Sequence, residues 1–292
     1  MSTKQNSNNI EFPQDLLPDY SMFARSCQSG LSVVYPFKAK VNSDPYGWKF
    51  GTRWPPSYAA FGRMRSLLAV HDALSFQPQK VLEVAAGGCG LAASLAYRGC
   101  QVTVNDLRSD DLANAIKEYE TGDKVRVVGG NLFDLSPKQL GKFDLVVACE
   151  IIEHVAHPGK LLKHLKAFLE PAGRILLTTP NGSYFRNRLP KYTEIADFRE
   201  LELRQFMPDA DGHLFLLTPE ELSDLTASVG LTVERLNVWG TPLLSGHVGL
   251  RFLANRFLAR AAYQVELLAQ RLPAVGREHL CFAMSAILRL AP

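Results

Sequence analysis

The sequence lacks the features that would mark a membrane, secreted or nucleic-acid-binding protein. Its 292 residues contain no long uncharged apolar run, and the first fifteen, MSTKQNSNNIEFPQD, are too polar for a signal peptide. Lys and Arg exceed Asp and Glu only slightly, 32 against 29, and they are scattered along the chain. No basic patch for nucleic acid is therefore expected. These absences predict a globular protein of the cytoplasm.

Cysteine is scarce and shows no paired pattern. The five cysteines are Cys27, Cys89, Cys100, Cys149 and Cys281, and no two of them form a CxxC motif. This spacing argues against a disulfide or zinc framework and favours reduced thiols. Internal repeats and low-complexity segments are absent as well. What the chain has instead is 47% apolar residues, which is enough for a large core.

Short apolar runs alternate with helical patterns from residue 81 onward. The runs cover 81–84, 101–106, 125–131, 143–149 and 174–180. These runs are apolar almost throughout. Between them, apolar residues recur at the spacing of a helix, for example Leu112 and Ile116 after Ser109, and Leu161 and Leu165 before the last run. Strands that are apolar throughout are buried on both faces. The pattern therefore predicts an α/β fold with a doubly wound, mostly parallel sheet.

The later chain adds two further strands and a capped helix. A loop of roughly forty residues, 181–217, is expected first. Thr218 and Glu221 then have the spacing of a capping box, with Pro219 at the first helical position and Gly230 closing the helix. Runs at 231–239 and 280–290 are expected to pair, which gives a Rossmann-like sheet of seven strands.

Two segments are expected outside this sheet. Residues 1–61 hold 11 of the 28 aromatic residues and six prolines without periodicity, so we interpret 1–56 as an N-terminal arm or lid on a domain of residues 57–292. Simple packing of the arm fits equally well. A helix at about 247–272 is expected as an insertion that packs on the domain or covers a pocket. Its arginines also allow peripheral membrane contact, and the helix could form a homodimer contact.

The turn VLEVAAGGCG, residues 81–90, ends the first strand with a glycine cluster. Gly88, Gly90 and Ala93 have the GxGxxA spacing of a dinucleotide turn. Glu83, however, is an acid inside the strand, and it would repel a pyrophosphate but attract a cationic ligand such as a sulfonium amino acid. No tyrosine is followed four residues later by lysine, so the short-chain dehydrogenase pair is missing. The turn therefore favours the cationic ligand.

Other strand ends carry groups that suit a nucleoside. Asp106 closes the second strand, where an acid can accept hydrogen bonds from both hydroxyls of a ribose. Asn131 and Leu132 follow the third strand, and one polar and one apolar side chain suit the edge and the face of an adenine.

In this order, five segments resemble the motifs of the class I S-adenosylmethionine-dependent methyltransferases. They are VLEVAAGGCG, VTVND, GNLFDL, DLVVACEIIEHVAHPGKLLKHLKAFLEPAGRILLTTPN and HLFLLTPEELSDLTASVGLTVE. The resemblance covers about residues 57–240 and is strongest to the small-molecule branch that includes the ubiquinone-biosynthesis O-methyltransferases. It implies methyl transfer from S-adenosylmethionine to a small-molecule acceptor, most simply to a hydroxyl oxygen.

The resemblance also implies the cofactor contacts. It assigns Glu83, Ala85 and Gly87 to the methionine end, Asp106 to the ribose, Asn131 and Leu132 to the adenine, and Cys149 and Glu150 to the amino group. Ala85 and Cys89 depart from the pattern, because these positions are usually glycine.

The segment EIIEH after the fourth strand holds the candidates for chemistry. Glu150, Glu153 and His154 would share one face if the segment were helical, and His213 arrives just before the capped helix. His154 is the expected general base, oriented by Glu153. Alternatively, these four residues hold a divalent cation, as the resemblance to ubiquinone-type enzymes and small-RNA 2′-O-methyltransferases implies. A third interpretation is a hydrogen-bonded loop that only shapes the cofactor site.

Other functions of the same fold stay open at this point. They are N- or C-methylation of a natural product, 2′-O-methylation of RNA, and a non-catalytic cofactor-binding protein. The acids Glu83 and Asp106, together with the cluster at 150–154, favour an enzyme.

Overall fold

The computed structural model describes residues 65, 68–70, 72–117, 122–205, 212–243, 264–266 and 268–292. The arm expected at 1–56 lies outside the described residues, as does most of the helix expected at 247–272. Residues 264–266 and 268–269, at the end of that range, are helical. Within the described part of the chain, no helix combines the length and the hydropathy needed to cross a lipid bilayer.

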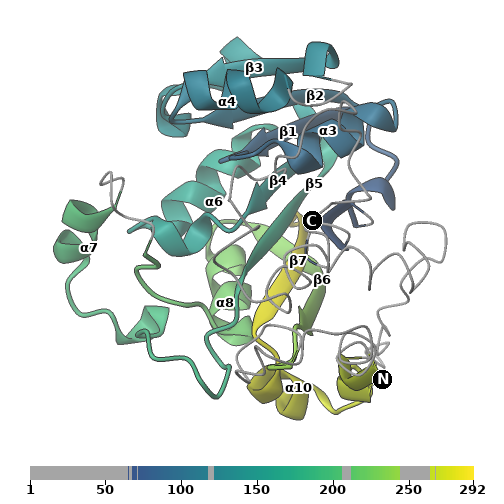
Figure 1. Ribbon diagram of the computed structural model, residues 1–292. Coiled ribbons are helices and arrows are strands. Elements are labelled where there is room, and N and C mark those ends of the chain that lie inside the picture. The colour runs from purple at the N-terminus through teal and green to yellow at the C-terminus, as the bar shows by residue number, and fades with distance from the viewer. Residues whose placement is uncertain are drawn as a thin grey trace.

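A single mixed sheet of seven strands organises the described residues (Figure 1). The strands are β1 (Lys80–Val84), β2 (Gln101–Asp106), β3 (Val125–Gly129), β4 (Phe143–Cys149), β5 (Leu169–Pro180), β6 (Leu231–Trp239) and β7 (Ala283–Leu290). Their order is β3-β2-β1-β4-β5-β7-β6. The first five run parallel, and β7 is antiparallel to both neighbours. The expected α/β, mostly parallel sheet is confirmed.

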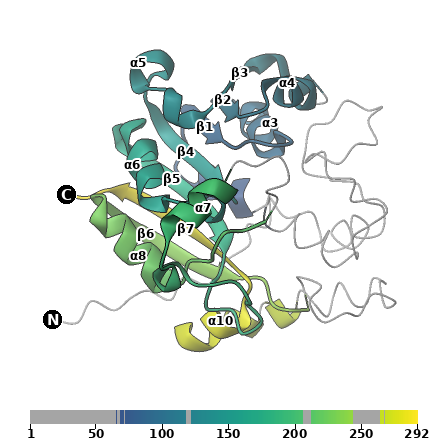
Figure 2. The same cartoon turned by 90° about the vertical axis from the view of Figure 1, so that its left-hand side faces the viewer.

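Helices cover both faces of this sheet. They are α3 (Gly90–Tyr97), α4 (Ser109–Lys117), α5 (Pro137–Leu140), α6 (Pro158–Ala167), α7 (Phe198–Arg204), α8 (Pro219–Ser228) and α10 (Ala274–Leu280). Figure 2 shows α3 on the opposite side of the sheet from α6 and α8. Two apolar cores result, one between the sheet and α3 (the α3 core) and one between the sheet and α6 (the α6 core). Alternate residues of a strand belong to different cores: Leu145 and Val147 lie in the α3 core, and Val146 and Ala148 lie in the α6 core.

The start of α8 has the capping box that its sequence predicts. The Glu221 amide donates to Thr218 Oγ1 at 3.1 Å, and the Thr218 amide donates to Glu221 Oε2 at 2.8 Å. Glu221 also accepts hydrogen bonds from the Thr193 amide and hydroxyl. The carboxylate therefore ties α8 to the segment that precedes it, and fixes where the chain enters the helix.

Residues 181–217 are not the irregular loop that the sequence predicts. They contain the 3-10 turn Tyr192–Glu194, the helix α7 and two isolated bridges, Asn181 to Leu217 and Lys191 to Leu216. Asp197 caps α7 by accepting a hydrogen bond from the Arg199 amide at 2.9 Å. The sequence did not predict them because α7 and the 3-10 turn are shorter than the window of about 11 residues over which helical periodicity is detected.

The turn between β1 and α3 contains two side-chain-bearing residues in the left-handed region. The φ angle is +51° at Ala85 and +57° at Cys89. A Cβ atom in this conformation crowds the following carbonyl. Glycine, which the methyltransferase motif usually has at these positions, would avoid this crowding. In this chain the turn is therefore formed with backbone strain at Ala85 and Cys89.

Replacing Ala85 by glycine is expected to stabilise the fold slightly. Relief of the left-handed strain is worth about 1 kcal/mol, and the greater freedom of glycine in the unfolded chain offsets part of it. The matched control is Ala113→Gly in α4, which is expected to lower the free energy of unfolding by about 0.5–1 kcal/mol. Urea unfolding of both variants measures the difference, and equal destabilisation of the two would contradict the argument.

Candidate active site

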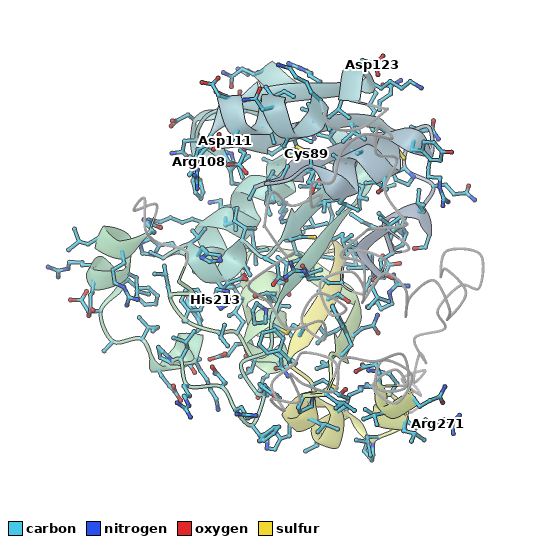
Figure 3. The ribbon with its side chains drawn as sticks, in the orientation of Figure 1. Cys89, Arg108, Asp111, Asp123, His213 and Arg271 are labelled. Carbon is cyan, nitrogen blue, oxygen red and sulfur yellow. The ribbon has the colours of Figure 1, made fainter. Side chains whose placement is uncertain are left out.

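The predicted site residues lie at or just after the carboxyl ends of β1, β2, β3 and β4, and His213 lies on the segment that leads into α8. The chain leaves β1 toward α3 on one face of the sheet and leaves the neighbouring strand β4 toward α6 on the other face. Open α/β sheets bind their ligands in a crevice at such a point, and we call this region at the strand ends the crevice. Figure 3 marks Cys89 at the start of α3 and His213 on the segment that leads into α8. The crevice therefore has an α3 side and an α8 side.

Glu83 lies near the end of β1 with its carboxyl group buried. The residue is 5% exposed, and its Oε2 has no hydrogen-bond partner among the described residues. Burial, with a further contribution from Asp106, raises the pKa of Glu83 to about 8. An unpartnered buried carboxyl oxygen fits a cationic group that would enter the crevice and restore its charge.

Asp106 links the end of β2 to the glycine turn. Its Oδ2 accepts a hydrogen bond from the Gly87 amide at 3.0 Å, and its Oδ1 accepts one from the Arg108 amide at 3.3 Å. Gly87 has φ of +48°, and a Cβ placed on it would meet no atom within 4 Å. The turn therefore leaves its backbone open beside a carboxylate whose remaining lone pairs suit a diol.

The loop after β3 is held by a buried amide. Asn105 Nδ2 donates to the carbonyls of Val128 at 3.0 Å and Gly130 at 3.1 Å. Asn131 Oδ1 accepts a hydrogen bond from the Phe133 amide, which caps a short 3-10 turn. Leu132 is buried, and its carbonyl accepts from His164 Nε2 at 2.8 Å. Contact of Asn131 and Leu132 with an adenine stays a prediction.

Glu150 does not share a helical face with Glu153 and His154, so that prediction was wrong. Its φ is +51°, which turns the chain at the end of β4, and only Ile152–His154 form a 3-10 turn. The Glu150 carboxylate accepts from Thr178 Oγ1 at 2.8 Å and pairs with Arg65 at 2.7 Å. Cys149, beside it, is a free thiol whose pKa burial raises to about 12. Both residues line the α3 side of the crevice.

Glu153, His154 and His213 come together on the other side. His213 Nε2 lies 3.9 Å from Glu153 Oε1, and the rings of His154 and His213 meet edge to face with centroids 4.9 Å apart. Glu153 is fully buried, and burial together with Glu150 raises the pKa of its carboxyl group. Glu153 therefore lies next to His213, and the orientation of His154 by Glu153 stays a prediction.

His213 is suited to accept a proton at neutral pH. Burial, and then the neighbouring His154, lower the pKa of its imidazole below the ordinary value. The side chain is nevertheless 31% exposed, so a ligand in the crevice can reach it. A neutral imidazole beside a carboxyl group is the usual arrangement of a general base.

The same three side chains could hold a divalent cation. One ligand atom from each of Glu153, His154 and His213 lies within 4.8 Å of the others. Two imidazoles and a carboxylate are ligands that zinc, iron or manganese accept. Glu150, the fourth ligand of the metal hypothesis, is not in this group because its oxygens contact Arg65 and Thr178.

The structure adds three residues that sequence reasoning did not single out. Arg65 reaches Glu150 from the helix before β1, while Thr178 and Thr179 at the end of β5 donate to Glu150 and Glu153. The threonines lie in the quoted motif TTPN, and their place at a strand end was the available signal. Arg65 had no such signal, because its role depends on how the helix packs.

The chain matches a protein family model and is similar to several known proteins. Residues 58–236, more than half of the chain, match the family model described as a methyltransferase domain. The chain is 30% identical over 157 residues to the ubiquinone biosynthesis O-methyltransferase of Xanthomonas axonopodis pv. citri (strain 306). That match covers 53% of this chain and 63% of that relative, slightly less than two thirds of its length.

Two further comparisons agree. A ubiquinone biosynthesis O-methyltransferase from Dechloromonas aromatica (strain RCB) is 29% identical over 169 residues, which cover 57% of this chain and 70% of that protein. The solved CcbJ methyltransferase of Streptomyces caelestis superposes with a TM-score of 0.53 at 18% identity. It covers 86% of this chain and 96% of its own. At this identity the structural likeness speaks for the fold alone.

Replacing Glu83 by glutamine is expected to change how stability depends on pH. Between about pH 5 and 8 the unfolded chain has lost the Glu83 proton and the folded protein retains it. The free energy of unfolding therefore falls as pH rises through this window, by about 1.4 kcal/mol per pH unit for this one proton. Glu83→Gln removes that contribution, while the slope from Glu153 remains in both proteins.

Chemical unfolding at pH 5, 6, 7 and 8 measures the slope. The exposed Glu200→Gln variant in α7 is the control and should keep the wild-type slope. Identical slopes for the wild type and Glu83→Gln would show that Glu83 is ionised in the folded protein at neutral pH.

Proposed function

We propose that this chain, which belongs to the methyltransferase-domain family, transfers the methyl group of S-adenosylmethionine to a hydroxyl oxygen of a small molecule. The observation that carries the proposal is the arrangement of the crevice. The buried Glu83, with one unpartnered carboxyl oxygen, and Asp106, placed to bind a ribose, lie on one side. Two histidines and the carboxyl group of Glu153 lie on the other. Different segments of the chain would thus supply the residues that bind the cofactor and the residues that act on the acceptor.

The α3 side fits S-adenosylmethionine. Glu83 would balance the positive charge of the methionine end, Asp106 would accept from the ribose hydroxyls, and the open backbone at Gly87 would allow close approach. Arg65, paired with Glu150, would offer its guanidinium to the carboxylate of the same end. When bound, the cofactor supplies a methyl group on a sulfonium whose leaving group is a neutral thioether, so the protein provides no acid for departure.

Residues on the α8 side would remove the proton of the acceptor hydroxyl. A hydroxyl oxygen becomes a good nucleophile as its proton leaves, and the neutral His213 with its lowered pKa can accept that proton. Glu153, 3.9 Å away, would stabilise the imidazolium that forms. His154 packs against the ring of His213 and restricts its orientation. A neutral amine acceptor needs no base before attack, so this cluster supports oxygen rather than nitrogen as the acceptor atom.

The acceptor class follows from the relatives and the charge. The relatives are named as O-methyltransferases of ubiquinone biosynthesis, which supports a hydroxyl on a small molecule. The scattered charge of the chain gives no support to RNA as the acceptor. We further propose that residues 1–56 and the segment 181–217 supply acceptor specificity. The segment at about 247–272 would pack on the domain or cover the acceptor, with peripheral membrane contact or a homodimer contact as additional roles.

A divalent cation bound by Glu153, His154 and His213 is the second candidate for this side. The observation in its favour is the short distance between the three ligand atoms. The ion would lower the pKa of the acceptor hydroxyl and replace the general base. The two roles predict opposite responses to a chelator.

His213→Ala is expected to lower turnover by about 10² to 10⁴, the range of a lost general base, with little change in cofactor affinity. The assay measures transfer of labelled methyl from S-adenosylmethionine to a panel of phenolic and aliphatic hydroxyl compounds. The exposed His279→Ala in α10 is the matched control and should retain wild-type turnover. Unaffected turnover in His213→Ala would exclude both the base and the ligand role.

The same assay with EDTA separates the two roles. A general base leaves activity unchanged by the chelator, whereas a metal site loses activity and regains it with Mg²⁺ or another divalent ion. In the second case His154→Ala should have the same effect as His213→Ala, because each substitution removes one ligand.

Asp106→Asn is expected to weaken binding of S-adenosylhomocysteine by about 2 to 4 kcal/mol, since two charge-assisted hydrogen bonds to the ribose are lost or reduced. Asparagine retains one acceptor oxygen for the Gly87 amide, so the turn should keep its shape. Calorimetry measures the affinity of the wild type and the variant. Absence of binding to the wild type would refute the cofactor assignment itself.

A further inference from the structure

Thr178 and Thr179 are consecutive buried residues at the carboxyl end of β5. They are 2% and 0% exposed. Successive side chains of a strand point to opposite faces of the sheet. The preceding residues confirm the alternation, because Leu176 lies in the α3 core and Leu177 in the α6 core. Thr178 therefore belongs to the α3 face and Thr179 to the α6 face.

Each threonine donates a hydrogen bond to a different glutamate. Thr178 Oγ1 donates to Glu150 Oε1 at 2.8 Å, and Thr179 Oγ1 donates to Glu153 Oε2 at 2.9 Å. The two acids are three residues apart in the chain, yet they are held on opposite faces of the same strand. The left-handed backbone at Glu150 makes this separation possible.

The second oxygen of each carboxyl group faces a different environment. Glu150 Oε2 pairs with the Arg65 guanidinium at 2.7 Å, on the side of the glycine turn. Glu153 Oε1 has no hydrogen-bond partner among the described residues and lies 3.9 Å from His213 Nε2. In both cases the threonine binds one oxygen, and the other oxygen lies beside a different group, Arg65 for Glu150 and His213 for Glu153.

The backbone strengthens the link between Glu153 and the histidine. The Leu214 amide donates to the Glu153 carbonyl at 2.9 Å, so the residue after His213 is tied to Glu153 directly. With this backbone contact fixed, the remaining freedom at the site is rotation of the Glu153 carboxyl group. Thr179 is the hydroxyl that restricts this rotation, and its branched Cβ leaves it few rotamers of its own.

We infer that the two threonines are separate positioning residues for the two halves of the site. Thr178 holds Glu150 and Arg65 in place for cofactor binding, and Thr179 holds Glu153 toward His213 for the chemistry on the acceptor. The division rests on the proposed function, because it assigns each face to one substrate of methyl transfer.

Four variants test the division: Thr178→Val, Thr179→Val, and the serine variants Thr178→Ser and Thr179→Ser. Valine keeps the branched shape and removes the donor, whereas serine keeps the donor. Loss of a hydrogen bond to a charged group is expected to change the affected property by about 10- to 100-fold. Each threonine is the matched control for the other, since both are buried neighbours on one strand.

The expected result is a double dissociation. Thr178→Val raises the dissociation constant for S-adenosylhomocysteine, measured by calorimetry, and changes the ¹⁵N shifts of the His213 imidazole less than Thr179→Val does, because Glu150 and Arg65 influence His213 only through their charges. Thr179→Val changes those shifts at constant pH and lowers kcat, with no change in the dissociation constant. Serine restores the wild-type value in both cases. The His213 signal is assigned by its loss in the His213→Ala variant.

Two results would overturn the inference. One is that both valine variants alter the dissociation constant and the His213 shifts to the same extent, which would mean a common structural effect on β5. The other is that Thr179→Val leaves the His213 shifts and kcat as in the wild type. If Thr179→Val does not fold, Thr179→Ala carries the same expectations without added bulk. Calorimetry and the imidazole shifts need no turnover, so they test the division even if no acceptor is methylated.

Discussion

Burial of carboxyl groups at one edge of the sheet is the constraint on which the rest of the site depends. Glu83 and Glu153 are almost completely removed from water, and an isolated carboxylate in such a place is costly. Each of these carboxyl groups therefore stays mostly protonated or needs a positively charged group beside it. The crevice is arranged around these two requirements, with a place for a cation beside Glu83 and a histidine pair beside Glu153.

The fold meets these requirements because parallel strands bring distant segments to the same edge. β1 supplies Glu83, β2 supplies Asp106 and β4 leads into Glu150 and Glu153. His213 comes from a different part of the chain, and the capping box of α8 fixes its approach. Side chains from four segments are thus brought to one edge while the sheet and its two cores stay unchanged.

Much of the fold was predictable from the sequence, since it depends on local patterns. The apolar runs predicted all seven strands, and Thr218 with Glu221 predicted the start of α8. The grouping of Glu153 and His154 with His213 could be expected from the place of the first two after the fourth strand and of His213 just before the capped helix. The turn at Glu150, the pairing with Arg65 and the elements between 181 and 217 depend on packing between distant segments. No local period encodes such contacts, so sequence reasoning missed them.

The position of β7 has a consequence for how the chain folds. This strand is the latest in the sequence, yet it lies inside the sheet, between β5 and β6. Until it is in place, those two strands each present an open edge with unpaired amides and carbonyls. A chain synthesised through β6 but not yet through β7 would therefore expose both edges. Sheet closure is a late, non-local step, which slows folding and makes the unfinished chain the form most prone to aggregate.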